Sequence, residues 1–457
     1  MPSNKKIMAE NKRLKKENAK LRMENAQLRQ LRQQVAELKK RVAELEAIVK
    51  LLTAGTILKE TPSWVKPSNQ KSRPKKSGAK NGHTPNHREV KEIDEENEVM
   101  LASCPHCDTP LGEPIDMWER ITEDIVPARL KVTKHRIYRY WCPMCKDKVE
   151  GHPEGVLPGQ HFGLHLMLLV CYLRTLGLTW QKIQTYLYEA FGIQISHGGL
   201  IHMEEVVAKA LGPLYGRFLE EIRKAKNVHA DDTSWRVDGE NHWLWVLLTK
   251  AVAYYTIRDT RSRKVIEDCL GPDFHGVVVL DFYPSFMNLP YEQQKCIVHL
   301  LRKMRDFEKK PEFKPGREWK RVKMRVKRMV TEALDANENM KDIEERSRLK
   351  QRLIARAEAV SQLPRKHEYA KKIARLVGQY KESLFTFLDH EGVHWENNPA
   401  ERGLRPMVVN RKTSFGSRSE EGAERRAILQ STAETARLQG TSFISYAGAE
   451  LGLPPQQ

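Results

Sequence analysis

Three acidic residues that are far apart in the sequence stand where strands or a helix could bring them together. Asp231 lies within an apolar run, Asp281 directly follows the run Gly-Val-Val-Val-Leu, and Glu401 follows an Asn-Pro pair typical of a helix start. Carboxylates on two or more rigid elements can hold a pair of divalent ions for phosphoryl transfer. Hard oxygen ligands suit Mg²⁺. The pattern predicts that Asp231, Asp281 and Glu401 are catalytic magnesium ligands.

Each of these acids also has a plainer interpretation. Asp231 and Asp232 are adjacent, and successive strand residues point to opposite faces, so only one of them can face Asp281. Asp281 could instead cap the segment that follows it. With Asn398 as N-cap, Glu401 would be the third helical residue, where a capping-box Glu is also expected.

Basic side chains close to Glu401 are suited to gripping phosphates, because arginine makes bidentate contacts with phosphate oxygens. Glu396 is a rival acid in the same stretch. The predicted DNA-binding residues are Arg402, Arg405, Arg411 and Lys412.

Two Cys-x-x-Cys pairs predict a structural zinc ribbon over 94–155. Each pair can present two thiolates to one tetrahedral ion, and short strands are expected between the pairs, over 129–140. Four reduced structural cysteines, or a redox pair, are the alternatives. A further Cys-x-x-His, formed by Cys296 and His299, could ligate a metal, but no second pair is evident and structural support is the favoured interpretation. The predicted zinc ligands are Cys104, Cys107, Cys142 and Cys145.

Strands and helices must position the three acids. Apolar runs at 227–235, 242–249 and 251–257 predict a three-stranded meander, followed by a helix over 262–270, a central strand at 276–280 and a helix from about 292 to 307. This order predicts a multidomain α/β protein with a ribonuclease-H-like core. The core would comprise 227–303 and 391–440, separated by a helical basic insertion at 304–390 and followed by a tail at 441–457.

The insertion has one apolar helical face, and ten Lys or Arg lie between positions 309 and 328 against two Glu. A charge-rich face is usually only solvated, but this excess has one sign and favours contact with DNA.

The region before the core divides into three further parts. Leucines and asparagines at heptad spacing predict a coiled coil over 1–53 that forms a homodimer or a larger assembly, with a single exposed helix as the alternative. Residues 54–93 predict a basic linker. Residues 156–226 predict helices, with Thr179 and Ser196 starting two of them and Gly192 between. That arrangement fits a helix-turn-helix or a plain helical packing domain.

Composition limits the class of partner. The 457 residues carry a formal net charge of +19, which favours a polyanion such as DNA. No apolar run reaches the length of a bilayer span, and the N-terminus does not resemble a signal peptide. We therefore expect a cytoplasmic protein with no membrane partner.

Several motifs together resemble the transposases of the bacterial insertion-sequence-sixty-six family. They are His-Ala-Asp-Asp-Thr-Ser-Trp, Gly-Val-Val-Val-Leu-Asp-Phe-Tyr, Cys-x-x-His-Leu-Leu-Arg and Asn-Asn-Pro-Ala-Glu-Arg-Gly-Leu-Arg-Pro followed by Arg-Lys. The resemblance implies an acidic-triad (DDE) enzyme that cleaves and transfers DNA strands, with Asp231, Asp281 and Glu401 as the triad. It also implies terminal inverted repeats and target DNA as substrates, and accessory proteins encoded by the element as possible partners.

The chain departs from the family pattern at two places. Asp232 stands where the family usually has Glu, which makes it a second plausible ligand, and the loop after Lys412 reads Thr-Ser-Phe-Gly-Ser. Two functions remain as alternatives. One is a non-catalytic DNA-binding regulator, and the other is a ribonuclease-H-like nuclease without joining activity.

Overall fold

The computed structural model describes residues 13, 16, 22–23, 93, 95–122, 130–363 and 366–453. Apart from isolated positions, the predicted coiled coil (1–53) and basic linker (54–93) lie outside the described residues. The chain divides into two compact units, Met1–Glu119 and Arg120–Gln457. Within the ranges described, no helix is both long and apolar enough to cross a bilayer.

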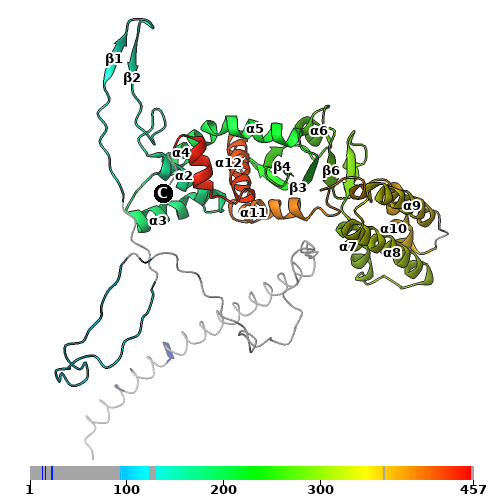
Figure 1. The fold of residues 1–457 in the computed structure, drawn as a ribbon, viewed down its shortest axis with the longest axis horizontal. Coiled ribbons are helices and arrows are strands. Elements are labelled where there is room, and N and C mark those ends of the chain that lie inside the picture. Colours follow the sequence, from blue (N-terminus) through cyan, green and yellow to red (C-terminus); the bar gives the residue numbers. More distant parts are fainter. Residues whose placement is uncertain are drawn as a thin grey trace, which may run out of the picture. The chain divides into compact units, whose positions relative to one another are not determined.

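A mixed five-stranded sheet forms the centre of the second unit (Figure 1). The first three strands form an antiparallel meander, and the last two run parallel to the first. The spatial order is β5-β4-β3-β6-β7. The strands are β3 (Asn227–Val237), β4 (Glu240–Leu248), β5 (Ala253–Arg258), β6 (Val277–Leu280) and β7 (Glu292–Lys295).

Strand β7 corrects the sequence prediction of a helix from about residue 292. The run Glu-Gln-Gln-Lys has no strand-like alternation, but Gln293, Gln294 and Lys295 are buried. The short helix η2 (Thr386–Leu388) covers this edge: the Thr386 hydroxyl donates to the Gln293 carbonyl at 2.8 Å, and the Gln294 side-chain oxygen accepts the Phe387 N–H at 2.9 Å. Residues about ninety positions away in the sequence therefore stabilise a strand that the local sequence does not predict.

Helices cover both faces of the sheet. On one face, α5 (Gly212–Arg223) and α6 (Lys264–Leu270) share an apolar cluster with β3, β4 and β6. On the other face, α11 (Asn398–Ser414) packs on the meander and α7 (Ile297–Glu308) packs on β6. The carboxyl end of β6 and the start of α11 therefore meet on the face shared by α7 and α11.

Helix α12 (Glu420–Leu438) closes the other sheet edge, at β5. The Ser431 hydroxyl accepts the Tyr255 N–H at 2.9 Å, and the Thr435 hydroxyl accepts the Ala253 N–H at 3.0 Å. Hydroxyls thus replace the strand that would otherwise satisfy these donors, as an exposed edge requires.

The helical stretch before the sheet follows its predicted boundaries. Helices α2 (Leu164–Thr175), α3 (Trp180–Phe191) and α4 (His197–Ala210) pack around one apolar cluster. The side chains of Thr179 and Ser196 cap α3 and α4, and Gly192 ends α3 with a φ of 66°. In the predicted tail, α13 (Phe443–Glu450) packs against α2.

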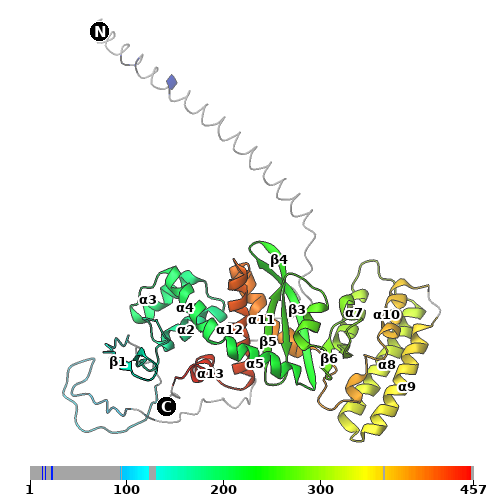
Figure 2. The ribbon, with the colours of Figure 1, turned by 90° about the horizontal axis from the view of Figure 1, so that it is seen from above.

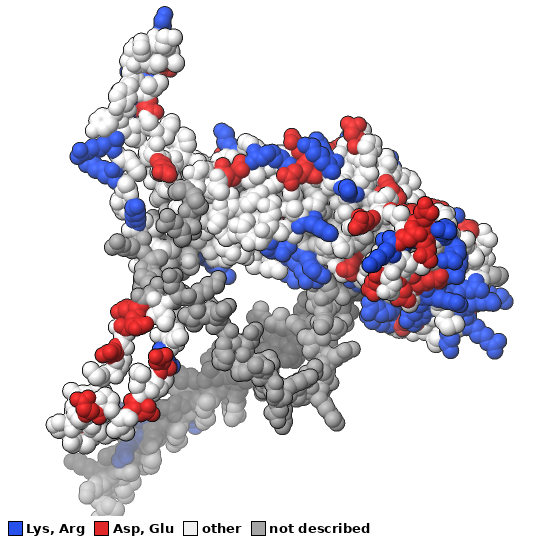
Figure 3. Space-filling view, viewed as in Figure 1, with Lys and Arg blue, Asp and Glu red and all other residues white. Residues whose placement is uncertain are grey.

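Three helices form the bundle that interrupts the core: α8 (Arg317–Asn339), α9 (Ile343–Ser361) and α10 (Glu368–Gln379). They enclose their own apolar cluster, to which α7 also contributes (Figure 2). Figure 3 shows Lys and Arg side chains gathered along the edge of this bundle where Figure 1 places α8.

The strands near the second cysteine pair differ from the prediction over 129–140. Strand β1 (Arg139–Cys142) pairs with β2 (Asp147–Glu150), and the described residues 130–138 contain no strand. The hairpin forms around the cysteine turn itself, because each strand needs a partner and the segment after the turn supplies one.

Candidate active site

The register of two parallel strands brings Asp231 and Asp281 together. His229 on β3 pairs with Val279 on β6, and the same register extended by two residues places Asp231 beside Asp281. Neighbouring strands lie about 4.8 Å apart, and residues in register point to the same face. The two carboxylates therefore share the face covered by α7 and α11.

Strand alternation separates Asp231 from Asp232. Asp231 pairs with Val246, an apolar residue beneath α11, whereas Asp232 pairs with Trp245 on the opposite face. The Asp232 carboxylate accepts a hydrogen bond from the Arg261 guanidinium at 2.7 Å, and its side chain is 3% exposed. Asp232 is therefore already paired, and the geometry favours Asp231 as the acid that faces Asp281.

Asn397, rather than Asn398, is the N-cap of α11, so Glu401 is the fourth helical residue and not the third. The expected capping box is wrong because the Asn397 side chain is drawn into the core. Its amide donates to the Ala230 carbonyl at 2.8 Å, and its oxygen lies 3.0 Å from His229 Nδ1, which must donate. The helix start is thereby tied to the residue before Asp231.

Close packing fixes the next turn of α11 on the sheet. The Tyr255 hydroxyl donates to the Gly403 carbonyl at 2.7 Å. A Cβ at Gly403 would lie 3.0 Å from a Leu248 methyl carbon, so a larger residue would push the helix outward. Glu401, two residues earlier, is held at a set height above the strands.

The other acids act electrostatically on Asp231. Burial raises the pKa of Asp231 well above its usual value, and the negative charges of Asp281, Asp232 and Glu401 raise it further. The Asp231 carboxylate accepts the Asp232 N–H at 2.9 Å, and no Lys or Arg within the described ranges forms an ion pair with it. One Asp281 oxygen accepts the Tyr283 N–H at 2.9 Å, but the N-cap of the short helix that follows, η1 (Pro284–Phe286), is Tyr283 and not Asp281. The region has an excess of negative charge.

Helix α7 presents two side chains to Glu401. His299 Nε2 and Arg302 Nη1 each lie 3.4 Å from the same Glu401 oxygen. Cys296, at the start of the same helix, accepts the Asn397 N–H on its sulfur at 3.1 Å, and burial raises the pKa of this thiol to about 11. A protonated, buried thiol does not bind metal well, so the geometry fits structural support for Cys296.

Carboxylate oxygens suit Mg²⁺, although the three carboxylates do not converge on a single point. Among the described residues, no three His, Cys, Asp or Glu side chains are gathered closely enough to hold a metal ion. We infer that Glu401 keeps the three carboxylates from converging, because its side chain is turned toward Arg302 and His299. Asp231 offers a buried carboxylate with no Lys or Arg ion pair among the described residues, and a divalent cation would neutralise its charge. Asp281, in register beside it, would supply further oxygens.

The four predicted DNA-binding residues fall into two groups. Arg402 and Arg405 are exposed on α11. Arg411 instead donates to the Thr233 hydroxyl at 3.1 Å and the Ser234 hydroxyl at 2.6 Å, so it joins α11 to β3. Lys412 is exposed and also takes part in an interaction.

The loop after Lys412, which departs from the family pattern, continues the sheet. Ser417 accepts the Asp238 N–H on its carbonyl at 3.0 Å, and its own N–H donates to the Arg236 carbonyl at 2.8 Å. Gly416 has a φ of 125° and lies directly against that Arg236 carbonyl, where no Cβ would fit. Contact with the end of β3 thus explains the glycine at position 416.

Each cysteine pair forms the same local turn, one in each unit. The residue after the second cysteine is left-handed in both, with a φ of 55° at Asp108 and 50° at Lys146. A hydrogen bond from the Thr109 hydroxyl lowers the pKa of Cys107, and one from the Cys145 N–H lowers that of Cys142. Both turns therefore favour the thiolate, the form that binds zinc.

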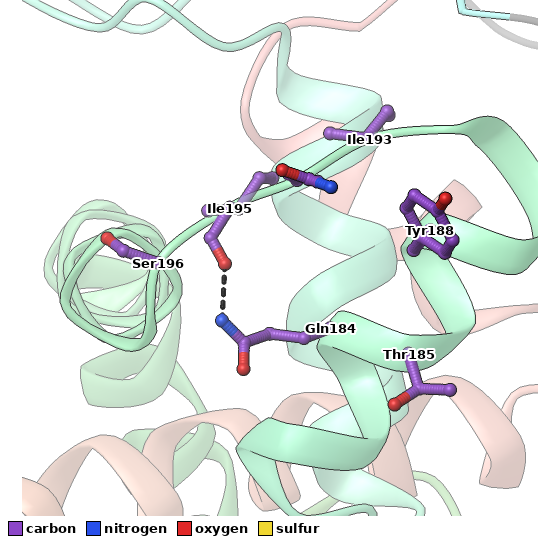
Figure 4. Close-up of a pocket in the computed structure, with 7 residues that line it drawn as sticks. Gln184, Thr185, Tyr188, Ile193, Ile195 and Ser196 are labelled. Atoms are coloured by element: carbon purple, nitrogen blue, oxygen red, sulfur yellow. Dashed lines mark hydrogen bonds between the residues drawn. The ribbon is translucent and has the colours of Figure 1, made fainter.

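A separate hollow lies between α3 and α4 (Figure 4). The Gln184 side chain crosses it and donates to the Ile195 carbonyl at 2.5 Å, and Thr185, Tyr188 and Ser196 also line it. No acid or cysteine lines this hollow, so it is unrelated to the carboxylate cluster.

Comparisons with known proteins define the class. Residues 102–146 match a family model described as the zinc-finger binding domain of transposase IS66, and they span both cysteine pairs. Residues 169–425 match the family model described as Transposase IS66 family, and they include all three acids. This second match covers more than half of the chain, which therefore belongs to the IS66 transposase family, and the predicted resemblance is confirmed.

One curated relative extends the similarity. The chain is 24% identical over 410 residues to the uncharacterised protein y4jD of Sinorhizobium fredii, covering 82% of this chain and 78% of that protein. Because y4jD is uncharacterised, this similarity assigns no activity.

Sequence reasoning missed three residues of this region. Arg261 was not singled out, and nothing local marks it, because it meets Asp232 only through the fold. Arg302 and Asn397 stand within the quoted family motifs, but no role was assigned to them. Their position in those motifs was the signal that could have found them.

Proposed function

We propose that this chain cuts and joins DNA strands at the ends of an insertion element, using two Mg²⁺ ions held by Asp231, Asp281 and Glu401. The observation that carries the proposal is the adjacency of Asp231 and Asp281 on parallel strands, beneath the helix that bears Glu401. Their excess negative charge, lacking a paired Lys or Arg at Asp231 among the described residues, supports a cationic ligand.

The sheet supports a ribonuclease-H-like core. A three-stranded antiparallel meander followed by two parallel strands, in the order β5-β4-β3-β6-β7, is the arrangement expected of that core. The first acid lies on the first strand, the second at the end of the fourth, and the third on a later helix.

When bound, the two ions would activate the attacking oxygen and stabilise the leaving oxygen. The chain's own residues would orient the reaction. Asp231 and Asp281 provide fixed oxygens, and Asn397 holds α11 against the strand that carries Asp231. Hydrolysis at the element end frees a 3′-hydroxyl, which then attacks a target phosphodiester in the same site and displaces a 3′-oxygen.

Other parts of the chain would assemble the DNA complex. We propose that Cys104, Cys107, Cys142 and Cys145 are structural zinc ligands, because both turns favour thiolates and the matched zinc-finger region spans them. Arg402 and Arg405, exposed one and four residues after Glu401, would contact phosphates near the reacting strand. The predicted coiled coil would pair two copies, one for each element end.

A strand-transfer assay tests the catalytic proposal. The donor would be a plasmid that carries the chain's gene with the DNA that flanks it, and the products would be scored as cleaved ends and as joined molecules. Asp231→Asn, Asp281→Asn and Glu401→Gln should abolish both products while end binding persists.

Glu396→Gln is the matched control for Glu401→Gln, because Glu396 is the rival acid five residues earlier and its carboxylate accepts a bond from Asn398. It should retain transfer. Full transfer by Asp231→Asn would contradict the assignment, and cleaved ends that never join would instead identify a nuclease.

A further inference from the structure

The outer face of α8 has a charge pattern that the catalytic proposal does not use. Its first twelve residues, 317–328, include seven Lys or Arg and one Glu. The apolar residues Trp319, Val322 and Val326 are buried in the bundle, which turns the cations outward. Six of the seven cations are exposed: Arg317, Lys320, Arg321, Arg325, Lys327 and Arg328.

These cations have no acidic counterparts. None of the six forms an ion pair within the part of the chain that the structure describes. The acids next to this face have other partners: Glu318 accepts the backbone N–H groups of Lys366 and His367 at 2.6 and 2.8 Å, and Glu308 pairs with Lys323. A face that is only solvated usually mixes both signs, so this one-signed face indicates a polyanionic partner.

Helix α9 provides the contrast within the same bundle. Arg348, Arg352 and Arg356 are exposed at intervals of four residues, the spacing of Arg317, Arg321 and Arg325 on α8. On α9, however, Arg348 lies 3.9 Å from Glu344, and Arg356 pairs with Glu332. The two faces have the same residue type at the same spacing, but among the described residues acidic side chains pair with these arginines only on α9.

The dimensions of the α8 face fit a DNA backbone. At 1.5 Å per residue, 317–328 extends about 16 Å. One DNA strand carries a phosphate about every 3.4 Å of helix axis, so this length faces roughly five phosphates. Side chains of this kind contact phosphates without reading bases.

The face is also rigidly connected to the carboxylates. Helix α7 carries His299 and Arg302 beside Glu401, and it ends at Glu308, about 14 Å further along by helical rise. Glu308 there accepts the Trp319 indole N–H of α8 at 2.8 Å and pairs with Lys323. The α8 face therefore lies outside the reacting site but at a set distance from it.

We propose that the outer face of α8 is a clamp for the backbone of duplex DNA, a few base pairs from the position where strands are cut. The proposal concerns binding and does not depend on the catalytic roles of the three acids. The DNA could be the element end or the target, since both present the same phosphates.

The test compares two triple variants of the full chain. Arg317→Gln with Arg321→Gln and Arg325→Gln removes half of the clamp, and Arg348→Gln with Arg352→Gln and Arg356→Gln is the control on α9. Affinity for a labelled 30-base-pair duplex would be measured by fluorescence anisotropy across a KCl series, with one duplex from the element end and one unrelated.

We expect the α8 variant to reduce the slope of log affinity against log salt by about two to three, because each lost phosphate contact removes about 0.9. The loss should be equal for both duplexes, the α9 variant should bind as the unchanged chain, and Arg→Lys at the three α8 positions should restore binding. An unchanged slope, an equal loss in the α9 control, or a loss limited to the element end would overturn the clamp.

Discussion

The molecule has two buried or partly buried groups of charged side chains, and they differ in whether their acids face arginines or other acids. At the junction of α2, α4 and α12, the buried Glu204 lies 3.8 Å from Arg174 and 3.7 Å from Arg425. Nearby, Arg426 is also buried and donates to the Arg174 carbonyl at 3.1 Å. By contrast, Asp231 in the middle of β3 lies in register with Asp281 at the end of β6, and Glu401 on α11 acts on the same region.

The difference indicates what each group is for. At the junction, the acid on α4 faces arginines from α2 and α12, so opposite charges hold helices from distant parts of the sequence together. In the carboxylate cluster, burial first and like charges second raise the pKa of Asp231, and a proton or an added cation would neutralise this carboxylate. Perturbed carboxylates of this kind are typical of functional sites.

The largest expected effect is the loss of strand transfer when the carboxylate cluster is changed. Asp231→Asn should reduce the rate of strand transfer by about 1,000-fold or more. Metal ions stabilise the transition state by several kcal/mol, and every 1.4 kcal/mol lost slows the reaction about tenfold. Transfer by Asp232→Asn, on the opposite face, should remain much higher. The measurement is the rate of joined product, with end binding followed in parallel.

The second effect is on the free energy of unfolding, which should fall for a change at the junction and rise for a change in the carboxylate cluster. Glu204→Gln should lower the free energy of unfolding by roughly 3 kcal/mol, because it leaves buried arginines without their acid. Asp231→Asn should stabilise the metal-free chain, since it removes a desolvated charge that its neighbours repel. Urea unfolding of both variants measures the contrast. A stable Glu204→Gln protein would mean that the junction charges are not essential to the fold.

A third effect should appear when metal is added. At a Mg²⁺ concentration one hundred times the dissociation constant, binding to the native state adds about 2.7 kcal/mol of stability. The wild-type chain and Glu204→Gln should both gain it, whereas Asp231→Asn should gain little. Thermal melts with Mg²⁺ and with a chelator provide the readout. Zn²⁺ must be kept at one concentration throughout, and equal gains in all three proteins would contradict a site at Asp231.

The two groups also show which features the sequence could predict. Local signals were sufficient for the ends of α3 and α4, because Thr179, Gly192 and Ser196 act on their own backbone. The meander and the adjacency of Asp231 and Asp281 followed from strand periodicity and the usual order of such a sheet. These features depend on residues near each other in the sequence or on a fold already expected from it.

What the sequence did not reveal depends on contacts between distant segments. Arg261 neutralises Asp232, and Asn397 moves the start of α11 by one residue because its side chain bonds to β3. Strand β7 is polar, and it is stabilised by its pairing with β6 and by η2, which covers its outer edge. The counter-charges of Glu204 come from α2 and α12, more than two hundred positions apart, and no spacing rule joins them.

The smallest effect concerns pH. Asp231 has a higher pKa in the folded chain than its usual value of 3.8, so between the two values the folded state keeps a proton that the unfolded state releases. Unfolding then releases protons, and this carboxyl's contribution to stability falls as pH rises above about 3.8. Asp231→Asn should remove that part of the pH dependence, as should saturating Mg²⁺, which replaces the proton as the neutralising charge. The comparison is the difference between variant and wild-type unfolding free energies from pH 5 to pH 8 in chelator. A difference that stays constant with pH would show that Asp231 is ionised in the metal-free fold and that Arg302 and His299 already balance the cluster.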